Sequence, residues 1–358
     1  MIDPADFDPK RAQSAMRRGL WSIALGVVLI GLALLAVSKS ELGAEAFDDL
    51  RNASHPALLG LSWGIISMAF LFMGLRWRAL MPPPHRPPAL GLTSIVCAGL
   101  LLNYAVPGPF GELGAAWFAN KRYRVPLADA LATGVAARLI GLATSALMAV
   151  LVWLFVELPP PSEDTALLHM ANQLIPLGAL TVGVGGILLF ALALRPSWWK
   201  HLSALTLGRW HGTGMLAVRA QQLNRAVASL ADALARAASR GRRAYGLTAF
   251  WSVAGHTTVI AGIAVAAHGL GATPNLAGLA FTYVATTAGA VALFAFPASQ
   301  MGWDLMFFSL LVAAAGLPAP IAGAIAVLVR LQQLSMMLIG ALSLAWLLNT
   351  TPRNLPDG

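Results

Sequence analysis

The chain has 358 residues and a net charge of +9, and it is 58% hydrophobic but only 11% charged. Soluble domains carry about a quarter charged residues. This composition, with a mean hydropathy of +0.70, therefore excludes a soluble globular protein and indicates an integral membrane protein. The single cysteine, Cys97, excludes a disulfide framework and a cysteine-based metal site.

Apolar segments follow one another along most of the chain, and about 20 such residues cross the hydrocarbon core of a bilayer. Six segments are uninterrupted, at about 20–37, 57–76, 126–156, 172–194, 246–267 and 319–348. Two longer segments, 89–119 and 276–316, are each interrupted by proline and glycine. The sequence therefore predicts an all-α polytopic membrane protein.

The charges of the loops predict which ends of these segments face the cytoplasm, because lysine and arginine collect in cytoplasmic loops. Lysine and arginine precede the first segment. Arg76, Arg78 and Arg86 lie at and after the end of the second segment, and nine lysines and arginines lie between positions 195 and 243. The loops at 41–49 and 157–164 are acidic and are predicted to be external. Both termini are thus predicted to be cytoplasmic, in a multi-pass protein of the plasma (inner) membrane.

The interrupted segment 89–119 has basic residues at both ends, so both ends should be cytoplasmic. Such a segment is a re-entrant hairpin, and we predict its tip at Pro107, Gly108 and Pro109, because proline breaks a helix. The segment 276–316, interrupted from Pro297 to Gly302, lacks basic ends, which predicts entry from outside. The prediction is six transmembrane helices plus two re-entrant hairpins in inverted repeats; the alternative is eight spans in a parallel repeat.

Five regions follow from this interpretation. They are a cytoplasmic N-terminal tail (1–18), a first membrane repeat (19–194), a basic cytoplasmic linker (195–244), a second membrane repeat (245–350) and a C-terminal tail (351–358). Within the linker, apolar residues recur at helical spacing between Leu216 and Leu234. This pattern predicts an amphipathic helix on anionic headgroups or packed under the bundle.

An acidic residue, a proline and an arginine recur with the same spacing in the two halves of the chain. A shift of 192 positions carries one set onto the other: Glu112, Pro126 and Arg138 onto Asp304, Pro318 and Arg330. Charged residues are rare here, so the repeated spacing of 26 residues from acid to arginine indicates a duplicated unit. Matching Leu and Ala positions add little, because the whole chain is apolar.

The two arginines are predicted to lie deep in the membrane. Proline is well suited to the first turn of a helix, and 12 residues at 1.5 Å each place the arginine about 18 Å along it. That depth is near the middle of a core about 30 Å thick, where an arginine must face a cavity, pair with an acid or bind an anion. We expect Glu112 to pair with Arg138 and Asp304 with Arg330, either for structure alone or to hold a lipid phosphate.

Polar residues near the breaks are expected to support these pairs. Asn103 and Gln300 flank the breaks and are expected to satisfy freed backbone groups or to line a cavity. Gln332 and Gln333, beside Arg330, are expected to form hydrogen bonds between helices.

No motif for a nucleotide, a metal or a nucleophile–base set is visible in the sequence. His256 and His268 have no partners at metal-ligand spacing, and we interpret both as packed or interfacial. We therefore predict no cofactor, no metal site, no catalytic residue and no nucleic-acid partner.

The pattern of Asn103, Pro107, Gly111 and Glu112, followed by Arg138, resembles the transmembrane region of lysylphosphatidylglycerol synthases. Similar flippase-like modules also exist as stand-alone membrane proteins. The second half echoes the pattern in Pro297, Gly302, Asp304 and Arg330. The resemblance covers about 15–350 and implies movement of lipids between leaflets. Fused members add a soluble aminoacyltransferase domain; the chain ends at Gly358, and we expect no synthase activity.

Three functions are compatible with this reasoning. The first is translocation of a phospholipid or lipid-linked anionic headgroup between leaflets, with anionic or phosphate-bearing membrane lipids as partners. The second is a non-catalytic accessory or scaffold subunit of a lipid or cell-envelope glycan synthesis complex, bound to a synthesis enzyme. The third, an intramembrane enzyme, is disfavoured because no catalytic set is visible.

Overall fold

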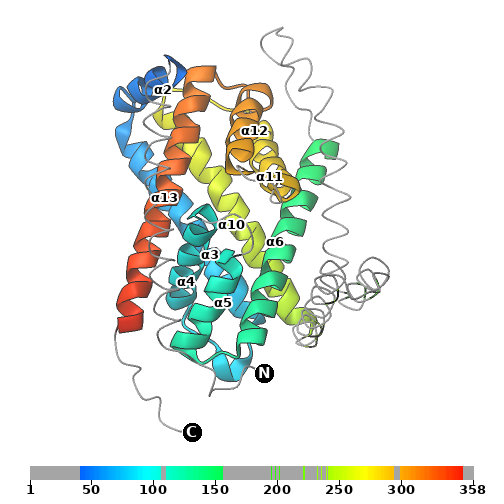
Figure 1. The fold of residues 1–358 in the computed structure, drawn as a ribbon. Coiled ribbons are helices and arrows are strands. Elements are labelled where there is room, and N and C mark those ends of the chain that lie inside the picture. Colours follow the sequence, from blue (N-terminus) through cyan, green and yellow to red (C-terminus); the bar gives the residue numbers. More distant parts are fainter. Residues whose placement is uncertain are drawn as a thin grey trace.

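The computed structural model describes residues 41–105, 110–155, 241–293 and 299–349, with single positions between 195 and 239. Its elements are helices (Figure 1). Four of them are long and apolar enough to cross a membrane: α3 (Pro56–Leu80), α6 (Leu127–Phe155), α10 (Arg242–Gly269) and α13 (Ala319–Asn349). They match four of the six predicted spans. The other two, 20–37 and 172–194, lie outside the described residues, as does most of the linker helix.

Four shorter helices form two antiparallel pairs. We call α4 (Ala89–Ala105) and α5 (Phe110–Tyr123) the first hairpin, and α11 (Leu276–Leu293) and α12 (Ser299–Ala313) the second hairpin. At 1.5 Å per residue, the 14 residues of α5 extend about 21 Å, which is less than the core of a bilayer. This length favours the predicted hairpins over the eight-span alternative, and the number of spans stays a prediction. Figure 1 shows the two hairpins toward opposite ends of the bundle.

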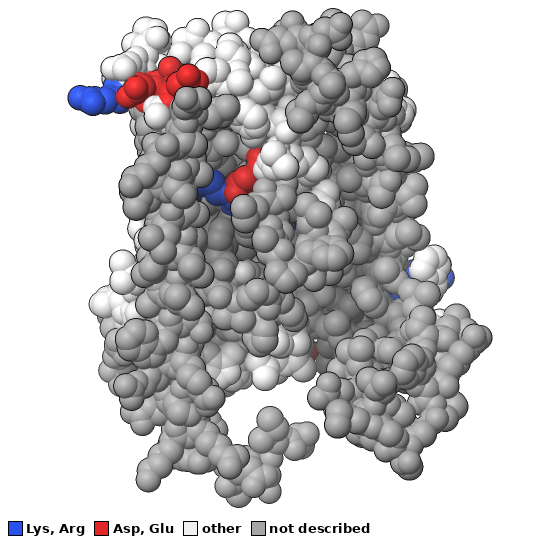
Figure 2. All heavy atoms as spheres, turned by 45° about the horizontal axis from the view of Figure 1, so that its top comes forward, with Lys and Arg blue, Asp and Glu red and all other residues white. Residues whose placement is uncertain are grey.

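Two small elements complete the described fold. The short helix α2 (Glu41–Arg51) packs against α13, and a 3₁₀ turn, η2 (Pro83–His85), follows α3. Figure 2 shows that acidic side chains gather at one edge of the described surface, where α2 lies, while a basic and an acidic group sit side by side in a hollow of the same face. The rest of the described surface in this view is mostly uncharged, as expected for a surface in contact with lipid.

The order of helices repeats along the chain. A shift of 192 positions brings α3 to α6 onto α10 to α13, element by element. The hydroxyl of Ser62 donates a hydrogen bond to the carbonyl of Gly262 (2.8 Å), and the hydroxyl of Thr248 donates one to the carbonyl of Arg76 (3.4 Å). Since the later residue of α3 meets the earlier residue of α10, these two corresponding helices run antiparallel.

The predicted helix starts are confirmed. Helices α6 and α13 begin directly after Pro126 and Pro318. Each proline carbonyl accepts the first helical hydrogen bond, from the N–H of Ala130 and of Ala322, at 2.9 Å in both cases. Proline fits there because its missing N–H would have had no partner in the first turn.

Of the three groups of buried apolar side chains in the described bundle, the two largest each pack one hairpin against the long helices. One packs the first hairpin against the end of α3 and the start of α6, and includes Trp77, Leu80, Ile95, Ala119 and Ile140. The other packs the second hairpin against the start of α3, the end of α10 and α13, and includes Ile66, Ile263, Phe307, Leu311 and Ile325. Lipid tails are as apolar as these side chains, so tight packing through many alanines and glycines stabilises the contacts.

Candidate functional site

The first predicted ion pair exists. The guanidinium of Arg138, on α6, contacts the carboxylate of Glu112, on α5. Both side chains are largely buried, with exposed fractions of 31% for Arg138 and 18% for Glu112. The pair therefore joins the first hairpin to the long helix that follows it.

Asn103 holds the two helices of the first hairpin together beside this pair. Its side-chain oxygen accepts a hydrogen bond from the N–H of Gly111 (2.7 Å), and its amide nitrogen lies 3.4 Å from both carboxylate oxygens of Glu112. Asn103 thus satisfies a backbone group freed at the start of α5, as predicted, and also orients the carboxylate. Gly111 is required for this approach, since a Cβ there would lie 2.2 Å from the carbonyl oxygen of Gly99.

The second predicted ion pair exists as well. The Nε atom of Arg330, on α13, donates to a carboxylate oxygen of Asp304, on α12. Its Nη1 atom donates to the side-chain oxygen of Gln333 at 2.9 Å, and its guanidinium lies 4.5 Å from the ring centre of Trp303. Arg330 is therefore satisfied by an acid, an amide and an aromatic ring, and its side chain is only 12% exposed.

One cavity of about 340 Å³ is lined by Glu112 and Arg138 of the first pair and by Arg330 of the second. Its lining comes from α3, α4, α5, α6, α10, α11, α12 and α13, so both hairpins and all four long helices contribute. The polar and charged side chains of the lining include Arg76, Asn103, Glu112, Arg138, His256 and Arg330. The cavity touches residues of both buried groups, such as Trp77 and Ala115 from the first and Ile66 and Trp303 from the second.

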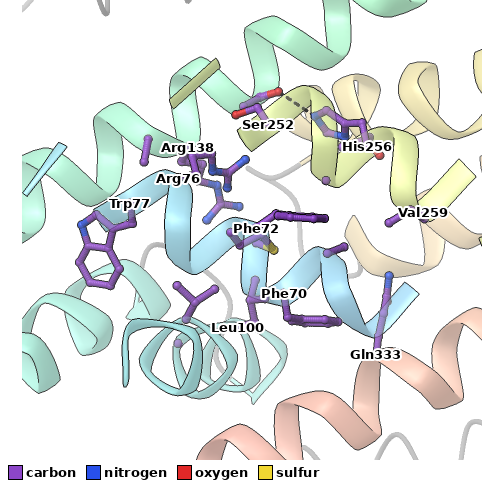
Figure 3. A pocket seen from close by; sticks show the side chains of 18 of the residues that line it. Phe70, Phe72, Arg76, Trp77, Leu100, Arg138, Ser252, His256, Val259 and Gln333 are labelled. Atoms are coloured by element: carbon purple, nitrogen blue, oxygen red, sulfur yellow. Dashed lines mark hydrogen bonds between the residues drawn. The ribbon is translucent and has the colours of Figure 1, made fainter. Parts of the chain in front are cut away.

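Arg76 is a charged residue of this cavity that the sequence analysis assigned to a cytoplasmic loop, and that assignment is wrong. Helix α3 continues to Leu80, so Arg76 is still within it. Figure 3 shows Arg76 and Arg138 side by side, and the two like charges repel each other. Arg76 is the last residue of the predicted segment 57–76, where an arginine is expected to flank the membrane, whereas the helix continues four residues further.

A glycine makes room for the Arg76 side chain. A Cβ at Gly141, on α6, would lie 2.0 Å from the Nη1 atom of Arg76. The carbonyl of Gly141 accepts a hydrogen bond from the Nε2 atom of His256 at 3.1 Å. His256 is thus buried and packed, as predicted, and it also forms part of the cavity wall.

Comparison with protein families supplies one match. The family model described as the lysylphosphatidylglycerol synthase TM region matches residues 20–341. The chain belongs to this family. Comparison with curated proteins and with solved structures gives no match. Family membership and the four long apolar helices together establish a multi-pass integral membrane protein.

Several residues that we predicted at the hairpin breaks lie at the ends of the described segments or outside them. Pro107, Gly108, Pro109 and Pro297 lie outside the described residues. Gln300 and Gly302 lie in the first turn of α12, but the structure does not describe the side chain of Gln300, so its predicted role stays a prediction.

The two glutamines beside Arg330 behave differently. Gln332 donates a hydrogen bond from its amide nitrogen to the hydroxyl of Ser67 on α3, at 3.0 Å, which confirms the predicted bond between helices. Gln333 accepts a hydrogen bond from Arg330 on its own helix, because a spacing of three residues places the two side chains on one helix face. A bond from Gln333 to another helix stays a prediction.

The lining offers binding groups more readily than catalytic ones. Arginine presents a planar fork of N–H donors suited to phosphate and carboxylate. In the part of the chain that the structure describes, no group of three His, Cys, Asp or Glu side chains could hold a metal ion. Chemically, the arrangement can bind an anionic group between helices of both halves.

Proposed function

We propose that this protein moves a lipid with a phosphate-bearing headgroup between the two leaflets of the membrane. The observation that carries the proposal is the shared cavity, whose wall includes Arg138 of one half and Arg330 of the other. Arginine at membrane depth is costly and characteristically lines the path of a polar ligand. Ion pairs serving structure alone would not need a common cavity.

The size and lining of the cavity support a headgroup as its occupant. Ligand sites usually measure about 300–1,000 Å³ and combine apolar walls with a few placed polar groups. Here a volume of about 340 Å³ is lined mainly by apolar and aromatic residues, among them Phe72, Trp251 and Tyr283. A charged headgroup would contact the arginines, while its acyl chains would stay among apolar side chains or in the bilayer.

The proposal includes a membrane topology. The basic residues Lys121 and Arg122 in the last turn of α5, and Arg242 and Arg243 at the start of α10, favour a cytoplasmic position for that end of the bundle. The first hairpin would then enter from the cytoplasm and the second from outside. Repeats of opposite orientation, with broken helices meeting near the middle of the membrane, are typical of proteins that alternate access to a central site.

A leaflet assay tests the proposal. Purified protein is reconstituted in vesicles with fluorescent phosphatidylglycerol in both leaflets, and a membrane-impermeant reductant reports how fast the inner-leaflet label becomes accessible. We expect the parent protein to speed this exchange and Arg330→Gln to slow it at least tenfold. The matched control is Arg243→Gln, which removes an exposed arginine outside the cavity lining.

Two results would contradict the proposal. One is a parent protein that leaves lipid exchange at the rate of protein-free vesicles. The other is an Arg330→Gln variant, folded by size-exclusion chromatography, that moves lipid as fast as Arg243→Gln. Either result would favour an accessory subunit, whose test is stable co-purification with a lipid- or glycan-synthesis enzyme.

A further inference from the structure

The cavity carries more positive than negative charge. Its described lining includes three arginines, Arg76, Arg138 and Arg330, and one carboxylate, Glu112. Asp304, outside the lining, pairs with Arg330, and Glu112 pairs with Arg138. Among the described residues, the Nε atom of Arg76 is buried without a hydrogen-bond partner. Within the described part of the cavity, the guanidinium of Arg76 therefore has no acidic partner once Glu112 and Asp304 are paired.

The excess of positive charge at the cavity arises from a difference between the two halves of the chain. In the second half, Gln333 accepts a hydrogen bond from Arg330. The position 192 residues earlier is Gly141, which has no side chain, and the Arg76 guanidinium lies against it instead. The counterpart of Arg76 in the second half is His268, at the exposed end of α10. Among the described residues at the cavity, the first half thus contributes two arginines and one acid, and the second contributes one arginine with its paired acid.

We propose that Arg76 and Arg138 form a phosphate-binding subsite, and that the lipid bound there has a net-anionic headgroup. The inference rests on the proposed function and narrows its substrate class. Two neighbouring guanidinium groups repel each other unless an anion lies between them, and a phosphate oxygen accepts charge-assisted hydrogen bonds from both. Glu112 alone cannot neutralise both arginines, because it carries a single negative charge.

The same charge balance disfavours a cationic headgroup. An aminoacylated phosphatidylglycerol bearing lysine has two ammonium groups and one phosphate, so its headgroup is positive overall. Its ammonium groups would need free carboxylates, whereas Glu112 and Asp304 are each already engaged with an arginine. Repulsion from Arg76 would add to this cost. We therefore expect phosphatidylglycerol to bind more tightly than its lysyl derivative.

Equilibrium binding tests the subsite separately from transport. The probes are short-chain phosphatidylglycerol, the same lipid carrying lysine, and inorganic phosphate, each titrated into the full-length protein in detergent. Tryptophan fluorescence is a suitable signal, because Trp77, Trp251 and Trp303 line the cavity. The test variant is Arg76→Gln, and the control is Arg78→Gln. Arg78 is on the same helix but outside the lining, with its Nε donating to the carbonyl of Pro87 at 2.9 Å.

We expect Arg76→Gln to weaken phosphatidylglycerol binding about tenfold or more, which is the usual effect of losing a charge-assisted hydrogen bond. Arg78→Gln should bind like the parent, and Arg76→Lys should retain part of the affinity. The thermal midpoint of lipid-free Arg76→Gln should equal or exceed that of the parent, because the repulsion with Arg138 is removed. If Arg76 served structure alone, its replacement by glutamine would instead lower the thermal midpoint.

Three outcomes would overturn the inference. They are unchanged phosphatidylglycerol binding in Arg76→Gln, equal or tighter binding of the lysyl lipid by the parent, and inorganic phosphate binding as tightly as the lipid, which would identify free phosphate as the ligand. If Arg76→Gln loses binding while the parent fails to exchange lipid between leaflets, the subsite stands and the transport proposal fails. If the parent exchanges lipid between leaflets but Arg76→Gln binds phosphatidylglycerol normally, the transport proposal stands and the subsite proposal fails.

Discussion

Replacing Gly111 by alanine should destabilise the first hairpin. The added Cβ would lie 2.2 Å from the carbonyl oxygen of Gly99 and 2.4 Å from the side chain of Asn103. A backbone oxygen cannot rotate away, so α4 and α5 must separate, and overpacking of this kind costs about 1–3 kcal/mol. The hydrogen bond from Gly111 to Asn103 would weaken too, at about 1 kcal/mol. The helix preference of alanine returns at most about 1 kcal/mol.

The expected net loss is therefore about 1–3 kcal/mol, seen as a lower midpoint of thermal unfolding in detergent. Gly64→Ala is the matched control, since a Cβ at Gly64, on α3, has nothing within 4 Å. That variant should be unchanged or more stable by up to about 1 kcal/mol. If Gly111→Ala unfolds at the same temperature as Gly64→Ala, the close contact between α4 and α5 described above is wrong.

Three further predictions concern the pairs and the topology. A double-mutant cycle with Asp304→Asn and Arg330→Gln should give a coupling free energy of about 1–3 kcal/mol in thermal or chemical unfolding; additive losses would mean that the contact has no energetic role. Ser67→Ala should lower stability by about 1 kcal/mol, because the amide of Gln332 loses its partner between α13 and α3, and an unchanged midpoint would exclude that bond as a stabilising contact. A cysteine introduced at Lys121, in a variant without Cys97, should react with an impermeant reagent only from the cytoplasmic side, and labelling from outside would refute the re-entrant topology.

Much of the described fold could be predicted from the sequence because membrane helices leave strong signals. Long apolar runs gave α3, α6, α10 and α13 to within a few residues. Rare charges then indicated the internal repeat, and Pro126 and Pro318 predicted where α6 and α13 begin. The partners Glu112 and Asp304 followed because an arginine in an apolar environment requires an acid or an anion.

The remainder depended on contacts that sequence spacing does not reveal. Arg76 was misassigned because an arginine near the end of an apolar run is usually at the membrane surface, where its long side chain reaches the interface. Its place in the cavity depends on Gly141, which is 65 positions away on another helix. In the sequence the two ion pairs are 192 positions apart, whereas the packing of α3 against α10 and of the hairpins around them brings Arg138 and Arg330 to one cavity.

The most direct test of this account is an experimental structure of the protein in a bilayer nanodisc containing phosphatidylglycerol. We predict a lipid in the cavity with its phosphate between the guanidinium groups of Arg76 and Arg138, within hydrogen-bond distance of both. A cavity holding only acyl chains, with every lipid phosphate at the membrane surface, would contradict it.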